Sequence, residues 1–246
     1  MIWFYSQMEE VMVPSSGTRE QLLSRGLSPE RMKPLPRWVD TGNFSPLRRD
    51  PFFWRNRGLT GALILLYVGR VSREKSLDLL VTAFRGLVDD GADISLAVIG
   101  DGPYRTGMES DLEGYPVLFT GYLSGEELLA GYASADLFVF PSATDTFGNV
   151  VLEAQASGLA VIVSDQGGPR ELMVDGETGL VFAAGSQQDL LAAVRSLISD
   201  HRRIAEMGRA ACQFTLTNAP DRGATFNTIL QSGVPLSDFG GNNLAV

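Results

Sequence analysis

The sequence predicts an α/β fold built on a doubly wound parallel sheet. From Ala62 onward, short apolar runs rich in β-branched residues alternate with amphipathic stretches, and each run ends at a Gly, Pro or Asp turn. This alternation is typical of βαβ units. The runs do not alternate strictly between apolar and polar residues, as expected of strands that helices cover on both faces. We therefore expect a parallel sheet between two layers of helices.

Each expected element coincides with one segment of this pattern. The expected strands are Ala62–Val68, Ile94–Ile99, Val117–Thr120, Leu137–Phe140, Ala160–Ser164 and Gly179–Phe182. Helices are expected where apolar residues recur at helical spacing. They are Leu77–Val88, Gly125–Ala133, Val150–Ser157, Pro169–Val174 and Gln187–Ser199. Because a doubly wound sheet binds its ligand beyond the carboxyl ends of the strands, the loops that follow the strands are the candidate site.

The chain divides into three parts. Residues 1–60 stand outside the alternation: Val11–Pro14 is expected to end a strand, Thr18–Arg25 to form a short helix, and several prolines mark an irregular connection after them. Residues 61–210 carry the predicted sheet, and residues 211–246 are expected to form a C-terminal extension without chemistry. We interpret the first part as the remnant of a preceding domain with its interdomain linker, so the chain is expected to be a fragment.

Composition excludes several classes of function. An apolar share of 44% in 246 residues supplies a sizeable core. The net charge of −9 gives no basic footprint for nucleic acid. The single cysteine, Cys212, excludes a disulfide scaffold. No apolar run approaches the ~20 residues of a transmembrane helix. A cytoplasmic protein is therefore expected.

The first candidate site is the loop Gly69–Ser76, which follows the first expected strand directly. Gly69 lets the backbone turn and approach a ligand. Arg70 and Lys75 could place one planar and one flexible positive charge on a diphosphate. The alternative is a solvated loop with ordinary surface cations.

The second candidate site follows the expected strand Leu137–Phe140. The segment Pro141–Ala154 passes through a polar turn at Gly148 into an expected helix, and the free N–H groups at the start of a helix favour anions. Asp145 and Glu153 bracket that start, so two carboxylates could accept hydrogen bonds from sugar hydroxyl groups. The alternative makes Asp145 a turn residue and Glu153 a solvated helix residue.

Other patterns are weaker. Asp165–Glu171 is again a strand, glycine turn and helix, and Gly100–Pro103 is more typical of a structural turn than of a phosphate cradle. His201 is the only histidine, so no Ser/His/Asp or Cys/His set can be built in this chain. The sequence also lacks a His/Cys metal cluster and an Asp-x-Asp pair. Protein cations would therefore have to neutralise a diphosphate, and no metal or other cofactor is expected.

Taken together, these stretches resemble the C-terminal domain of the family 4 glycosyltransferases, a retaining group of GT-B architecture. The resemblance runs from about Val11 to Met207, and the order and spacing of its phrases agree. The phrases are Pro36-Arg37-Trp38-Val39-Asp40-Thr41, Tyr67-Val68-Gly69-Arg70 with Glu74-Lys75, Val98-Ile99-Gly100-Asp101-Gly102-Pro103, Ala133-Ser134-Ala135-Asp136, Phe147-Gly148 through Glu153-Ala154 to Ser157-Gly158, and Gly167-Gly168 to Glu171.

The resemblance implies roles for the candidate residues. Arg70 and Lys75 would hold the donor diphosphate as it leaves, and with Asp145 they are the implied catalytic residues. Glu153 would bind the ribose hydroxyl groups. Asp145 departs from the family pattern, because a glutamate usually stands at its position. The charge is retained on a shorter side chain, so the resemblance still implies contact with the donor sugar, with a geometry that the family pattern does not fix. The other implied donor-binding residues are Gly69, Tyr122 and Leu123 near the base, and Phe147, Gly148, Asn149 and Val150 through their backbone amides.

By the same resemblance, the function is retaining transfer of a hexosyl group from a nucleotide-diphosphate sugar to an acceptor hydroxyl. The wording Thr144-Asp145-Thr146-Phe147-Gly148 is most similar to mannosyltransferase branches that use GDP-mannose, with UDP-hexose as the second choice. The acceptor, a lipid or a glycan, would bind mainly to an N-terminal GT-B half in cis or in trans, through which the protein could lie peripheral to a membrane.

Three other interpretations stand beside this one, and the sequence favours the first of them. The chain could be a non-catalytic nucleotide-sugar-binding subunit or a truncated remnant that needs a separate N-terminal half. An isomerase or phosphorylase on the same architecture would need further acid/base groups or a cofactor-bound lysine, and only Lys33 and Lys75 are present. Glycoside hydrolysis would need two carboxylates that flank the scissile bond, which a loop and the following helix turn do not establish.

Overall fold

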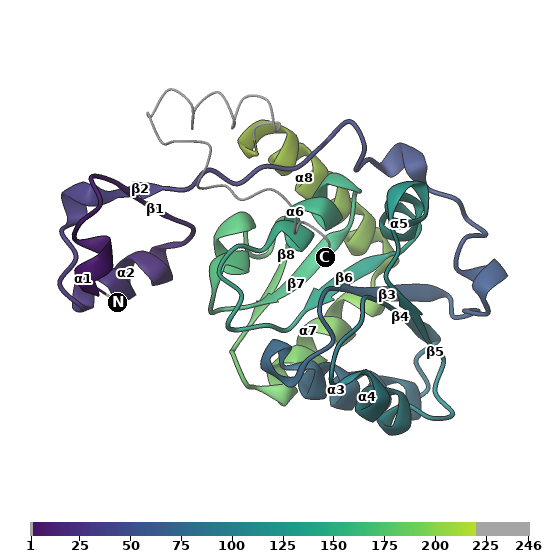
Figure 1. Ribbon diagram of the computed structural model, residues 1–246. Coiled ribbons are helices and arrows are strands. Elements are labelled where there is room, and N and C mark those ends of the chain that lie inside the picture. The colour runs from purple at the N-terminus through teal and green to yellow at the C-terminus, as the bar shows by residue number, and fades with distance from the viewer. Residues whose placement is uncertain (1, 220–246) are drawn as a thin grey trace.

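The computed structural model describes residues 2–219 (Figure 1). Its main body contains a six-stranded parallel sheet in the order β5-β4-β3-β6-β7-β8. The strands are β3 (Leu63–Val68), β4 (Ile94–Ile99), β5 (Val117–Gly121), β6 (Leu137–Phe140), β7 (Ala160–Ser164) and β8 (Gly179–Phe182). The predicted parallel sheet is confirmed.

Helices cover both faces of this sheet (Figure 1). The helices are α3 (Leu77–Asp89), α4 (Arg105–Asp111), α5 (Gly125–Ala133), α6 (Asn149–Ala156), α7 (Gln187–Ile198) and α8 (His201–Asn218). On one face α3 packs against α4 and α7, and on the other α6 packs against α8. Every residue of β3 and β4 is buried, because such a central strand has no face turned to water.

The structure differs from the prediction at several helices. The predicted helix Pro169–Val174 is a 3-10 turn, η5 (Gly168–Leu172), whose length is limited by Gly167 before it and an extended Met173 after it. Helix α4 was not predicted. Neither was α8, which runs through residue 210, where the predicted C-terminal extension begins. Residues 220–246 of that extension lie outside the described part.

The direction of winding reverses between β3 and β6. From β3 the chain winds outward through β4 to the edge strand β5, and it then returns to add β6, β7 and β8 on the other side of β3. The loops after β3 and β6 therefore leave the same edge of the sheet and run in opposite directions. Doubly wound folds bind ligands at this switch point.

The N-terminal residues form a small separate unit (Figure 1). It contains α1 (Ile2–Tyr5), β1 (Val11–Val13), α2 (Ser16–Ser24), η1 (Pro29–Arg31) and β2 (Met32–Pro34), and β1 pairs in parallel with β2. Four buried side chains form its own core: Val11, Val13, Leu27 and Met32. The strand and helix predicted in this segment are confirmed.

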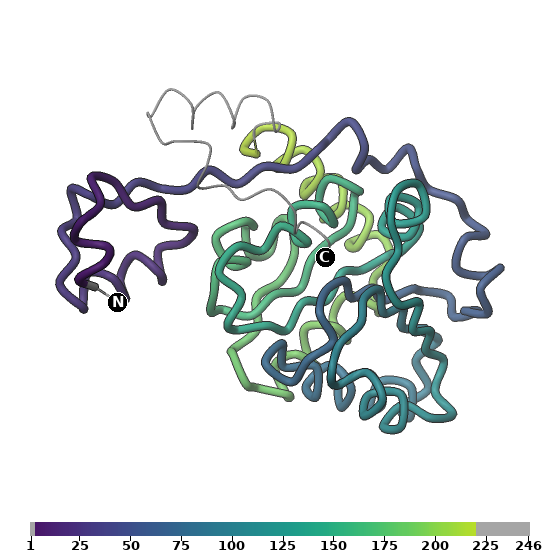
Figure 2. Tube along the Cα trace, viewed as in Figure 1, coloured from purple at the N-terminus to yellow at the C-terminus, as the bar shows by residue number. Residues whose placement is uncertain are grey.

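From β2 the chain extends across the helices to the far side of the main body (Figure 2). It then forms two 3-10 turns, η2 (Pro46–Arg48) and η3 (Arg55–Arg57). Val39, Phe53, Trp54 and Leu59 of this stretch are buried in the same core as the sheet. The indole N–H of Trp54 donates to the Gly131 carbonyl at 3.2 Å. The second half of residues 1–60 is therefore packed into the main body.

Among residues 2–219, no helix is long and apolar enough to cross a membrane.

Candidate functional site

The loops after β3 and β6 are joined by an ion pair at the switch point. The Lys75 ammonium lies 2.8 Å from Oδ2 of Asp145, and both side chains are only about one-fifth exposed. Lys75 ends the 3-10 turn η4 (Arg73–Lys75), and Asp145 lies in the loop before α6. A second contact supports the first, because the Thr144 hydroxyl donates to the Glu74 carbonyl at 3.1 Å. The loops of the two predicted candidate sites are thus in direct contact.

Asp145 also organises the turn that leads into α6. Its Oδ1 accepts the N–H groups of Phe147 at 3.0 Å and Gly148 at 2.8 Å. Burial opposes ionisation of Asp145, but Lys75 and the two N–H groups outweigh burial, so the pKa of Asp145 lies below its ordinary value. Oδ1 thus caps the turn, as the turn interpretation of Asp145 expects. Oδ2 pairs with Lys75, which neither the turn interpretation nor the sugar-binding interpretation anticipated.

The lowered pKa of Asp145 makes a prediction about stability and pH. A carboxyl group whose folded pKa is depressed stabilises the fold fully above its unfolded pKa, and the contribution is lost as pH falls through the folded pKa. We expect Asp145→Asn to lower the free energy of unfolding by about 1 kcal/mol near neutral pH. The difference from the parent chain should shrink as pH falls below 3.8. Urea unfolding of both proteins across this range measures it, and a constant difference would contradict the assignment.

The Arg70 side chain does not reach the same turn. It is 64% exposed, and its Nη1 lies 3.6 Å from the Glu74 carboxylate. The backbone of Arg70 is held by the core, because the buried Tyr67 hydroxyl donates to the Arg70 carbonyl at 2.9 Å. The structure therefore brings Lys75 and Asp145 together at the Gly148 turn, whereas Arg70 lies on the same loop with its guanidinium in solvent.

Glycine contacts hold the loop after β3 in place. The Gly69 N–H donates to the Ile99 carbonyl at 3.0 Å, and the Val71 N–H donates to the Asp101 carbonyl at 2.9 Å. The Gly100 N–H donates to the Gly121 carbonyl at 2.8 Å. The segment after β4 thus acts as the expected structural turn, and it connects the loop after β3 with the loop after β5. In that last loop Tyr122 is 60% exposed, and Leu123 is half-buried.

The start of α6 offers further polar groups. Gly148 precedes the helix in the left-handed conformation with φ of 76°. Asn149 and Val150 are its first residues, so their N–H groups lack acceptors within the helix. The Oδ1 atom of Asn149 is buried without a hydrogen-bond partner among the described residues. A buried oxygen of this kind is available to a ligand donor.

Glu153 lies one turn further along α6 and is half-buried. Its Oε2 accepts a hydrogen bond of 2.8 Å from the hydroxyl of Tyr132 on α5. Burial raises the pKa of Glu153, and the hydrogen bond from Tyr132 opposes that rise in part. The interpretation of Glu153 as a solvated helix residue is therefore wrong.

Comparison with known proteins gives the family. Residues 49–214 match the family described as glycosyl transferases group 1. This range is more than half of the chain and contains the whole site. The chain belongs to this family.

Relatives of this group 1 domain agree with the match. The chain is 34% identical over 210 residues to the sulfoquinovosyl transferase SQD2 of Arabidopsis thaliana, and the alignment covers 83% of this chain and 40% of that protein. It is 36% identical over 211 residues to a GDP-mannose-dependent alpha-mannosyltransferase of Mycobacterium tuberculosis, which covers 84% of this chain and 53% of that protein. The chain spans about half the length of these relatives.

Solved structures confirm the fold of the group 1 domain. HepE of Anabaena, in complex with UDP and glucose, aligns with a TM-score of 0.83 at 20% identity over 94% of this chain and 64% of that chain. The C-terminal domain of LpcC, a glycosyl transferase group 1 family protein of Francisella tularensis, aligns with a TM-score of 0.66 at 24% identity over 73% and 97%. The expected GT-B, Rossmann-like fold is confirmed.

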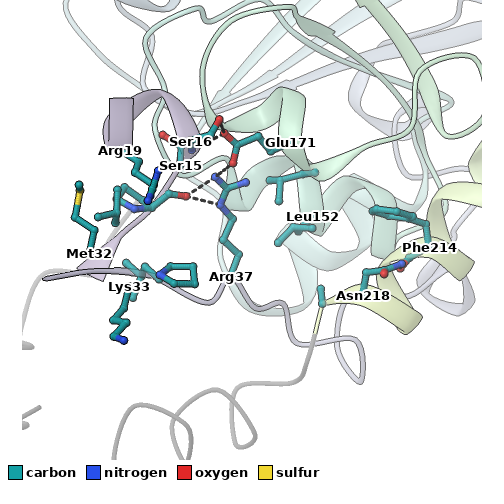
Figure 3. Close-up of a pocket in the computed structure, with 16 residues that line it drawn as sticks. Ser15, Ser16, Arg19, Met32, Lys33, Arg37, Leu152, Glu171, Phe214 and Asn218 are labelled. Carbon is teal, nitrogen blue, oxygen red and sulfur yellow. Dashed lines mark hydrogen bonds and ion pairs between the residues drawn. The ribbon is translucent and has the colours of Figure 1, made fainter. Parts of the chain in front are cut away.

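One cluster, at the contact between the N-terminal unit and the main body, was not predicted as a site (Figure 3). Arg37 donates to the carbonyl of Gly168 at 3.0 Å and pairs with Glu171 at 2.9 Å. It also donates to the carbonyl of Pro14, and Ser16 donates to Glu171. The cluster therefore ties the N-terminal unit to the turn after β7. Beside it lies a cavity of about 510 Å³ whose apolar lining includes Met32, Leu35, Leu152, Leu172 and Phe214.

Arg37 and Glu171 stand in two separate phrases of the resemblance, and no role was predicted for either. The sequence does mark the two residues as candidates, because an arginine stands in a proline-rich stretch and a glutamate follows a glycine pair. Nothing in the sequence indicates that they pair, because they lie 134 positions apart.

Proposed function

We propose that this domain binds a nucleotide-diphosphate sugar at the switch point between β3 and β6. It takes part in transfer of a hexosyl group, of the mannose or glucose type, to an acceptor hydroxyl with retention of configuration. The observation that carries the proposal is the Lys75 ammonium, held 2.8 Å from Asp145 beside the turn that begins α6. A fixed cation next to a helix N-terminus favours a bound pyrophosphate.

In the proposed reaction, the bond between the anomeric carbon and the diphosphate oxygen breaks, and a bond to the acceptor oxygen forms. Negative charge develops on the departing diphosphate, and Lys75 and Arg70 stabilise it electrostatically. Arg70 is the mobile partner, because its exposed side chain can leave Glu74 when the diphosphate arrives. The acceptor hydroxyl proton passes to a departing phosphate oxygen, so the step balances without a redox partner.

The other candidates receive the remaining parts of the donor. One carboxylate oxygen of Asp145 accepts a further hydrogen bond, from a sugar hydroxyl, in addition to its bonds within the protein. The N–H groups of Asn149 and Val150 bind phosphate oxygens. Glu153 accepts hydrogen bonds from the ribose hydroxyl groups. The exposed Tyr122 and its neighbour Leu123 pack against the base. Gly69, Phe147 and Gly148 permit close approach of the backbone.

The nucleotide is proposed to be guanosine-based. Several relatives carry GDP-mannose-dependent in their names, among them those of Mycobacterium tuberculosis and Mycolicibacterium smegmatis. HepE, by contrast, is described with UDP and glucose. We expect calorimetric titration of the purified chain to give tighter binding of GDP than of UDP or ADP. Tighter binding of UDP would move the assignment to a UDP-hexose, and no binding of any of the three would overturn the proposal.

The second candidate function is a nucleotide-sugar-binding subunit without turnover of its own. It is favoured by one observation, that the relatives are about twice as long as the part this chain matches. We propose that acceptor binding needs an N-terminal GT-B half in cis or in trans, so the purified chain should bind nucleotide without robust transfer. Rapid transfer of the sugar to lipid or glycan acceptors by the purified chain alone would contradict this.

A further inference from the structure

Tyr132 is fixed in the core beneath the site. It lies near the end of α5 and is fully buried. Its ring meets Phe44 edge-on with centroids 5.5 Å apart and packs against Phe138 of β6 at 6.0 Å. Phe138 in turn stacks on Phe140. A ring held on two sides in this way has little rotational freedom, so its hydroxyl group occupies a defined position.

The hydroxyl of Tyr132 is a committed donor to Glu153. Burial and the nearby carboxylate raise the pKa of Tyr132 well above its ordinary value, so the proton stays on the phenol. It donates to Oε2 of Glu153 at 2.8 Å. Among residues 2–219, no side chain or backbone group donates to Oε1 of the same carboxylate. One oxygen of Glu153 is thus anchored and the other is free to accept.

We propose that Tyr132 is a positioning residue for recognition of the ribose diol. By holding Oε2, it fixes the plane of the Glu153 carboxylate and directs Oε1 toward the hydroxyl groups of a ribonucleoside diphosphate. The hydrogen bond also opposes the rise in the Glu153 pKa that burial causes, which favours the ionised carboxylate, the stronger acceptor. This inference rests on the proposed function, because it takes the ligand of Glu153 to be ribose.

The test compares a ribonucleotide with its counterpart that lacks the diol. Dissociation constants are measured by calorimetry for GDP and 2′,3′-dideoxy-GDP, or for the corresponding pair of the base that binds tightest. The readout is the dissociation constant of 2′,3′-dideoxy-GDP divided by that of GDP. This ratio measures how strongly the diol contacts favour the ribonucleotide. In Tyr132→Phe we expect this ratio to fall by about two- to tenfold, because one hydrogen bond is lost while the ring packing is kept.

Tyr67→Phe is the matched control. Tyr67 is also fully buried and stacks on Phe140, but its hydroxyl donates to the Arg70 carbonyl instead of Glu153. We expect its removal to affect binding of both nucleotides equally and to leave their ratio unchanged. A ratio that falls equally in both variants would show general loosening of the aromatic stack and would overturn the proposal.

The pH profile separates positioning from packing. Burial and Tyr132 are the influences on the pKa of Glu153, and Tyr67 of β3 raises that of Tyr132. Without the phenol donor, the Glu153 pKa should rise further. As the pH is lowered, Glu153 of Tyr132→Phe should therefore become protonated, and the variant should lose diol discrimination, at a higher pH than the parent. An unshifted profile would overturn the inference.

A second variant covers the case in which Tyr132→Phe does not fold. Glu153→Gln should also reduce the ratio, and the double variant should lose no more than Glu153→Gln alone, since both changes remove one coupled interaction. Additive losses would overturn the role of Tyr132. If the parent chain itself bound both nucleotides equally, the assignment of ribose to Glu153 would fail, which is a separate outcome from failure of Tyr132.

Discussion

Replacing Lys75 with alanine is expected to weaken binding of nucleoside diphosphate by about ten- to hundredfold. A hydrogen bond to a charged group contributes about 1.5–3 kcal/mol, and each 1.4 kcal/mol is a factor of ten in the dissociation constant. Lys75 lies at the junction of the two loops, and its side chain is only 18% exposed. Its loss therefore removes the positive charge and leaves Asp145 without its cation. Calorimetric titration with GDP measures the change.

Lys33→Ala is the matched control, because Lys33 is the other lysine of the chain and is exposed on β2. It should leave the dissociation constant unchanged. The loss in Lys75→Ala should also depend on the ligand, since guanosine has no phosphate for Lys75 to contact. Equal weakening of guanosine and GDP would show that Lys75 supports the fold of the loop and not the diphosphate.

The strands were predictable because complete burial requires a continuous run of apolar residues, which is visible in the sequence. In β3 and β4 every residue is buried, so each strand is a continuous apolar run that ends where the chain reaches the loop. Helix α8 left a weaker record. Its buried stripe is Ile204, Met207, Gly208, Ala211 and Thr215, in which small and polar residues replace the usual large apolar ones. Gly208 is needed because a Cβ there would lie 2.2 Å from the Gly158 carbonyl oxygen.

The candidate site was predictable only as a set of loops. The rule that parallel strands end at one edge placed Lys75, Asp145 and Glu153 near one another. Pairing within that set depends on distances of a few ångströms that sequence patterns do not contain. Arg70 was expected at the diphosphate, yet it pairs with Glu74, which is negatively charged like a phosphate and lies four residues further along the chain. Tyr132 gave no signal, since a buried tyrosine on a helix resembles any core residue.

The polar groups of the site form a connected arrangement and not separate contacts. Tyr67 holds the backbone of Arg70, Lys75 holds Asp145, and Asp145 holds the N–H groups of Phe147 and Gly148. Stacked rings of Tyr67 and Phe140 lie beneath them. Lys75, Asp145 and the turn N–H groups therefore already have partners, whereas Oδ1 of Asn149 has none among the described residues. A ligand that contacts the first set must add to or replace these internal bonds, and a ligand donor can bond to Asn149 directly.

The largest loss of stability is expected from Gly100→Ala. Gly100 follows β4 with φ of 130°, and a Cβ there would lie 2.0 Å from the Gly69 carbonyl oxygen. That atom is backbone, so it cannot rotate away as a side chain would. Overpacking and a positive φ both oppose the new methyl group, and the free energy of unfolding should fall by about 3 kcal/mol or more. Urea denaturation of the purified variant measures the change.

Gly114→Ala separates the two causes. Gly114 also has a positive φ, of 84°, but no atom lies within 4 Å of its added Cβ. It should therefore show the backbone cost alone, about 1–2 kcal/mol. The excess loss in Gly100→Ala measures the clash with Gly69, which can be relieved only by moving the loop that carries Arg70 and Lys75. Folded Gly100→Ala should consequently bind GDP more weakly, whereas Gly114→Ala should bind it normally. Equal stability of the two variants would mean that the loop after β3 yields without cost, and the site would then not be rigidly preorganised.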